Sequence, residues 1–168
     1  QFSATVLPIF FPDPSIIMSL FSITINMINS SSSLVSSTAF ASTSQMFSIL
    51  CDLCLKCNEG ELPKAVLNEI RGIVDIPFTK EANKIAYVVF KDVANLFHEK
   101  KTQWIRVNSM HSDRIVSLMN IIIAAHYSFI KKEQAFVNIV DSVVQTKEMK
   151  NSLHFETDIT FVTLYCDT

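Results

Sequence analysis

TKEANKIAYVVFKDVANLFHEK, residues 79–100, is the stretch that decides the fold class. Its apolar residues recur three or four positions apart, with charged residues between them, which is the pattern of an amphipathic α-helix. Thr79 is the expected N-cap. The inner face is predicted to hold Ala82, Ile85, Ala86, Val89, Phe90, Val93, Leu96 and Phe97. The outer face is predicted to hold Lys80, Glu81, Lys84, Lys91, Asp92, Glu99 and Lys100.

Two further helices are predicted after this one. The first opens at Ser112-Asp113 and has no formal charge from Ile115 to Ile130. Because apolar residues surround its axis, we expect it to be central and buried, or covered by a partner. Lys131-Lys132-Glu133 predicts a break, and an amphipathic helix then runs to about Met149.

Two helices are also predicted before residue 79. One begins near Ser42 or Ser44, either of which could cap it, and runs to about Cys57 before Gly60 ends it. A shorter helix spans residues 62–74, with Pro63 in its first turn.

Near the two ends of the chain, the apolar residues no longer recur at helical spacing. Apolar and polar residues alternate over 21–27 and again over 155–161, which predicts two strands. The serines between residues 30 and 37 predict a loop. The expected fold is therefore mainly α, a bundle of about five helices with a small two-stranded sheet joining the N- and C-terminal segments. It forms a single domain, 1–168, with a charge-poor extended segment over 1–38, a helical core over 39–150 and a terminal strand over 151–168.

Charge is distributed unevenly along the 168 residues. The chain is 49% hydrophobic and 18% charged with a net charge of −2, and Asp13 is the only charged residue among the first fifty. The stretch 5–28 is apolar, but Pro8, Pro12 and Pro14 interrupt it. The part after Pro14 is too short for a spanning helix of about 20 residues, so no transmembrane span is expected.

Glycine occurs only at positions 60 and 72. That excludes a Walker A loop, a G-x-G-x-x-G fingerprint and a G-x-S-x-G elbow, and with them the enzyme classes that depend on these motifs. A catalytic site assembled from dispersed Cys, His and carboxylate residues stays open, without a substrate class to propose.

CDLCLKC, residues 51–57, is the most chemically suggestive motif. On a helix Cys51, Cys54 and Cys57 fall on one side and could bind zinc or iron–sulfur with Cys166 or a histidine. The chain lacks a second cysteine pair of this kind, so we favour small apolar core residues, then disulfides among Cys51, Cys54, Cys57 and Cys166, then metal. No cofactor is expected.

The histidines and the basic segment favour structural roles. His126 lies in an apolar helix and is expected to bond a backbone carbonyl rather than act as a base. Residues 98–106 mix basic and aromatic side chains, but the cluster is short and the net charge negative, so nucleic acid is not expected as a partner. Trp104 is expected to anchor a helix end.

The sequence favours a non-enzymatic interaction or assembly subunit that acts through an apolar, charge-poor surface, with a protein partner or a second copy. The alternative is a secreted helical carrier of a small apolar ligand. The start at Gln1 and the sequon at Asn29, a candidate glycosylation site, favour secretion over the cytoplasm.

Overall fold

The computed structural model of the chain describes residues 14–56, 81–107 and 109–145. These residues are mainly helical, as expected. The helices are α2 (Pro14–Ile28), α3 (Ser33–Lys56), α5 (Glu81–Phe97), α6 (Ser112–Lys132) and α7 (Gln134–Val144).

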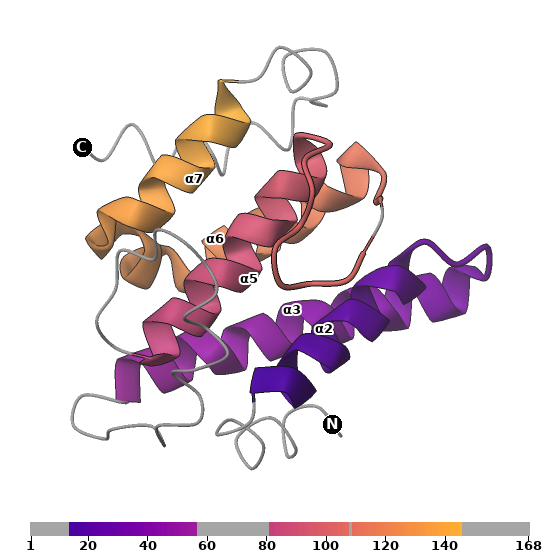
Figure 1. Ribbon diagram of the computed structural model, residues 1–168, viewed down its shortest axis with the longest axis horizontal. Coiled ribbons are helices and arrows are strands. Elements are labelled where there is room, and N and C mark those ends of the chain that lie inside the picture. The colour runs from indigo at the N-terminus through magenta and orange to yellow at the C-terminus, as the bar shows by residue number, and fades with distance from the viewer. Residues whose placement is uncertain (1–13, 57–80, 108, 146–168) are drawn as a thin grey trace.

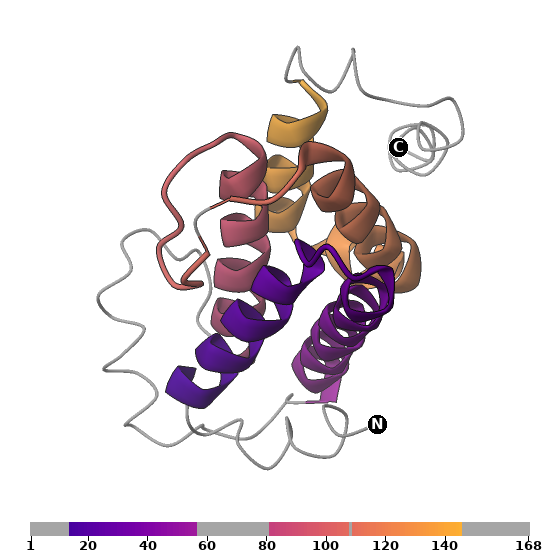
Figure 2. The same cartoon turned by 90° about the vertical axis from the view of Figure 1, so that its right-hand side faces the viewer.

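The helices pack in two connected groups. Helices α5, α6 and α7 each contact the other two, and α3 lies against both α5 and α6. Helix α2 packs on α3 to form a helical hairpin at one side of the bundle, which Figures 1 and 2 show from two directions. The hairpin is therefore an outer layer, and its inner face is held by the rest of the bundle.

An aromatic cluster joins four of these helices. The ring of Phe90 on α5 lies 5.5 Å from that of Phe47 on α3 and 5.7 Å from that of Phe136 on α7. Phe129 on α6 lies 5.3 Å from Phe136. Phe47, Phe90 and Phe136 are almost fully buried. Because large aromatic side chains contribute most to core stability, this cluster fixes how α3, α5, α6 and α7 meet.

The strong helical patterns are confirmed. The helix predicted within 79–100 and the helix predicted to open at Ser112 are α5 and α6, and the predicted break lies at Glu133, whose backbone is extended. Helix α6 packs against three neighbours, which explains its apolar composition. One strip still faces solvent and includes Ile121, which is 43% exposed.

The strand predicted over 21–27 is wrong, because these residues belong to α2. The buried side chains Ile17, Phe21, Ile25 and Ile28 recur at helical spacing. The hydroxyls that suggested a polar strand face instead bond the preceding turn. The Ser22 hydroxyl donates to the Met18 carbonyl at 2.7 Å, and the Thr24 hydroxyl donates to the Leu20 carbonyl at 3.0 Å.

The start predicted for the next helix is also wrong. Helix α3 begins at Ser33 rather than at Ser42 or Ser44, so most of the serine-rich segment is helical. The buried Ser36 hydroxyl donates to the Ile28 carbonyl at the end of α2, at 2.7 Å. This bond satisfies a carbonyl that a helix C-terminus leaves without an intrahelical partner, and it fixes the turn between α2 and α3.

Several predictions fall outside the described residues: the helix over 62–74, the Thr79 cap and the strand over 155–161. No strand occurs within residues 14–56, 81–107 and 109–145, so the small sheet is not supported there. Among the helices that the structure describes, none has the length and apolarity needed to cross a membrane, in agreement with the sequence.

Candidate interaction surface

The α2–α3 hairpin carries no charge over most of its length. From Pro14 to Leu50 the sequence contains no Asp, Glu, Lys, Arg or His. Both helices also keep large apolar side chains in solvent: Leu34 is 74% exposed, Ile23 57% and Met27 45%. Ile23 and Met27 are four residues apart and so share one face of α2. We call this outer surface of α2 and α3 the hairpin face.

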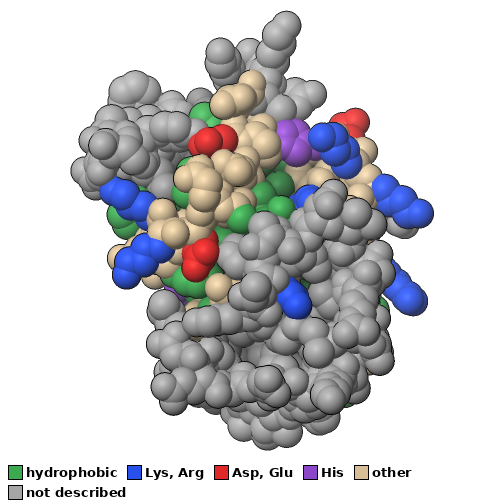
Figure 3. Space-filling view, turned by 60° about the vertical axis from the view of Figure 1, so that its left-hand side comes forward, with side chains coloured by type: hydrophobic (Ala, Val, Ile, Leu, Met, Phe, Trp, Pro, Cys, Tyr) green, Lys and Arg blue, Asp and Glu red, His purple; other side chains and the backbone are tan. Residues whose placement is uncertain are grey.

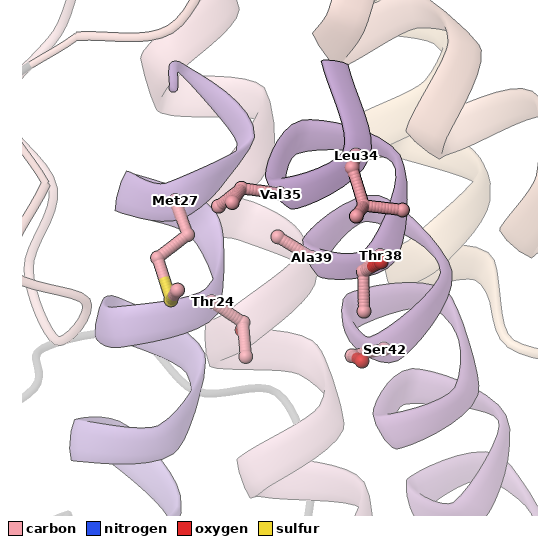
Figure 4. Close-up of a pocket in the computed structure, with 7 residues that line it drawn as sticks. All are labelled: Thr24, Met27, Leu34, Val35, Thr38, Ala39 and Ser42. Carbon is pink, nitrogen blue, oxygen red and sulfur yellow. The ribbon is translucent and has the colours of Figure 1, made fainter. Parts of the chain in front are cut away.

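A groove runs between the two helices on this face. Its volume is about 300 Å³, and its lining is mostly apolar. Figure 4 shows Met27 and Thr24 on the α2 side, with Val35 and Ala39 between them and Leu34. The remaining lining residues are Thr38 and Ser42 on α3. The groove thus adjoins Leu34 and Met27, two of the most exposed apolar residues that the structure describes.

Several polar groups on the hairpin form hydrogen bonds within the fold. The Thr24 hydroxyl bonds carbonyls of its own helix, and the Thr43 hydroxyl donates to the Ala39 carbonyl at 2.8 Å. The Asn26 and Asn29 amides donate to the carbonyls of Arg106 and Ser109, at 3.1 and 2.8 Å. A partner could therefore cover the groove wall at Thr24 without leaving its hydroxyl unbonded.

The cysteine motif lies away from this groove, at the far end of α3. Cys51 and Cys54 are buried, and neither forms a disulfide. Burial raises the pKa of the Cys51 thiol far above its usual range, and neighbouring Cys54 and Asp52 act in the same direction. A protonated, buried thiol is a poor metal ligand. No group of three metal-ligating side chains occurs in the described ranges, and Cys57 and Cys166 lie outside them.

His126 occupies a kink in α6, where its backbone φ is −125° and ψ is 28°. The expected bond to a carbonyl is not present at its buried Nε2, which has no hydrogen-bond partner in the part of the chain described. Burial lowers the pKa of the imidazole, and Asp52 acts weakly in the opposite direction. The interaction with Asp52 places His126 near the cysteine end of α3.

Asp92 is the residue that sequence reasoning missed. Its side chain was expected on the outer face of α5, but it is only 1% exposed. The carboxylate accepts backbone N–H bonds from Gln103, Trp104 and Ile105, each at 2.7 Å. It thereby fixes the loop from α5 to α6 and buries Trp104, the expected anchor. The sequence offers no local signal, because the partners lie more than ten residues away.

Comparison of the chain with protein-family models, with curated proteins and with solved structures found no match in any of the three. The inference of function therefore rests on the hairpin face and on the chemistry of the remaining surface.

Proposed function

We propose that this chain is a non-enzymatic assembly subunit whose hairpin face binds the same face of a second copy. The observation that carries the proposal is Leu34, which is 74% exposed beside an apolar groove of about 300 Å³. Apolar surface of this kind in contact with water is typical of sites that another molecule covers.

The absence of charge supports a second copy as the occupant. Residues 14–50 carry no charged side chain, so two hairpin faces that meet bring no like charges together and bury no unpaired charge. A partner with charges at the contact would lose their hydration and gain no counter-ion from this face. In a two-fold dimer, Leu34 of each copy would meet the groove of the other.

Native mass spectrometry of the purified chain, combined with one substitution, tests this proposal. We expect a dimer for the wild type and a monomer for Leu34→Lys, because the substitution places an unpaired ammonium in an apolar contact. The matched control is Ile121→Lys, which adds the same charge at an exposed isoleucine of α6. A wild-type chain that is monomeric at every concentration tested contradicts the proposal.

A second function, the binding of a small apolar ligand, is supported by the same groove. Its volume of about 300 Å³ falls at the lower end of the range for ligand pockets. The same spectra separate the two functions. A monomer that retains an extra lipid-like mass favours the carrier, whereas a dimer without added mass favours the assembly subunit.

A further inference from the structure

A second cavity lies on a different face of the molecule, between α5 and α7. It is a cleft of about 800 Å³ in which α5 contributes Lys91, the turn after α5 contributes His98 and Lys100, and α7 contributes Asn138 and Ser142. Figure 3 shows this side of the bundle, with basic side chains towards both edges and acidic as well as uncharged side chains between them. The proposed assembly function makes no use of this cleft.

The described lining of this cleft has one sign of charge. It includes Lys91, Lys100 and His98, and no Asp or Glu. Glu99 and Asp141 are next to lining residues in the sequence but do not line the cleft. Neither Lys91 nor Lys100 has a carboxylate partner within ion-pair distance among residues 14–56, 81–107 and 109–145. Two ammonium groups at one cleft, with no carboxylate among the described lining residues, attract an anion.

Hydrogen bonds fix the geometry of the walls. The Ser142 hydroxyl donates its proton to the Ile139 carbonyl at 2.7 Å. In the 3.4 Å contact between His98 Nε2 and Ser142 Oγ, the histidine is therefore the donor, and it links the end of α5 to α7. The Lys91 ammonium lies 5.4 Å from the centre of the Tyr87 ring, which holds it on the α5 wall.

The cleft also has an apolar part. Ala94 of α5 and Ala135 and Ile139 of α7 also line it, and these side chains offer no hydrogen bonds. The Asn138 amide oxygen accepts a bond from Gln134 at 2.9 Å, which leaves its nitrogen as a donor. A fitting ligand therefore combines an anionic group for the lysines with an apolar body. The volume is that of a site for a small organic molecule.

We propose that the α5–α7 cleft binds a small organic phosphate monoester. A phosphomonoester carries about −1.5 to −2 charges at neutral pH and three acceptor oxygens, which suits two ammonium groups better than a single carboxylate does. The phosphate is bound by the Lys91 and Lys100 side chains, with the Asn138 amide as an additional donor. The organic part lies against Ala94, Ala135 and Ile139.

Titration of the full chain with phenyl phosphate, followed by calorimetry and by backbone amide NMR shifts, tests the site. We expect shifts confined to α5, α7 and residues 98–100, and tighter binding than for inorganic phosphate or benzoate. Lys91→Gln and Lys100→Gln should each weaken binding about tenfold or more, the effect of losing one charge-assisted bond.

The control is Arg106→Gln, which removes one exposed positive charge outside the cleft and should leave the affinity unchanged. Equal weakening by Arg106→Gln would show attraction to charge in general and would overturn the site. Binding of inorganic phosphate as tight as that of phenyl phosphate would overturn the organic ligand class. The absence of shifts at saturating phenyl phosphate would overturn the proposal altogether. None of these outcomes depends on dimerisation through the hairpin face.

Discussion

Asp92 is the residue on which the connection between α5 and α6 depends. Its carboxylate is buried and accepts three backbone N–H bonds at 2.7 Å, from Gln103, Trp104 and Ile105. Charge-assisted bonds of this kind are about twice as strong as neutral ones, and their loss inside a protein leaves donors without a partner.

Asp92→Asn is expected to destabilise the fold by about 3 kcal/mol, because the amide nitrogen would face backbone donors that need an acceptor. Urea unfolding followed by the fluorescence of Trp104 measures this loss. The control is Asp113→Asn, at an exposed carboxylate in the first turn of α6, which should cost about 0.3–1 kcal/mol. Equal losses for the two variants would show that Asp92 has no special role.

His126 predicts a specific dependence of stability on pH. Burial lowers its pKa in the folded chain below the ordinary value of 6.5, so below that pH the unfolded chain binds more protons. Stability should therefore be fully present above pH 6.5 and decline as the pH falls through the folded pKa. In urea unfolding measured from about pH 8 to about pH 5, the free energy of unfolding of His126→Gln should fall less steeply than that of the wild type. The control His111→Gln, at an exposed histidine, should show the same decline as the wild type. An unchanged pH dependence of stability in the His126 variant would contradict the assignment.

Cys51 is expected to be unreactive in the folded protein. Its thiol is buried and its pKa is raised, so almost no thiolate is present at neutral pH. Iodoacetamide should label Cys51 only after denaturation, and peptide mass spectrometry reports the site. Labelling of Cys51 at equal rates in the folded and unfolded chain would contradict its placement in the core.

At the scale of elements, the sequence predicts α5, α6 and α7 well, because each has a long stripe at helical spacing and polar residues at its ends. The sequence-based prediction fails at α2, where the apolar residues fit both the alternation of a strand and the spacing of a helix. Phe21 and Ile25 fit both an alternating strand and a helical stripe, and only Ile17 and Ile28 extend the stripe to helix length. The serine and threonine hydroxyls between them bond carbonyls of the preceding turn, so their polarity does not require the exposed face of a strand.

The hairpin turn provides a prediction at this scale. Ser36→Ala should cost about 1 kcal/mol, because it leaves the buried Ile28 carbonyl without its 2.7 Å bond. Ser37→Ala is the matched control, since Ser37 is exposed and its bond to the Leu34 carbonyl is longer, at 3.2 Å. Thermal unfolding of both variants gives the difference, and an equal change in both would argue against the role of Ser36.

At the scale of the whole molecule, the structure presents two faces of different chemistry. The hairpin face is free of charge and has an apolar groove, whereas the α5–α7 cleft is lined partly by lysines and amides. The charge-poor first fifty residues predict an apolar surface, and this stays a prediction; the hairpin face is free of charge from Pro14 to Leu50 and exposes Ile23, Met27 and Leu34. The groove could not be predicted, because it exists only where α2 lies beside α3. The α5–α7 cleft could not be predicted either, because its two walls come from residues about fifty positions apart in the sequence.

Salt should affect binding at the two faces differently. Self-association through uncharged residues should change less than about threefold when NaCl is raised to about 0.5 M, since screening acts only on charges. Binding of phenyl phosphate at Lys91 and Lys100 should weaken markedly over the same range. Sedimentation and calorimetry in matched buffers measure the two effects, and a dimer that dissociates in salt would point to a charged interface instead.

Sedimentation equilibrium of the wild type, Leu34→Lys and Ile121→Lys tests the central claim most directly. The account predicts that the wild type and the Ile121 variant approach twice the mass of one chain as concentration rises. Leu34→Lys should stay near the mass of one chain, with a dissociation constant raised at least about 100-fold. The same dimer mass for the folded Leu34 variant, or a monomeric wild type, would contradict assembly through the hairpin face.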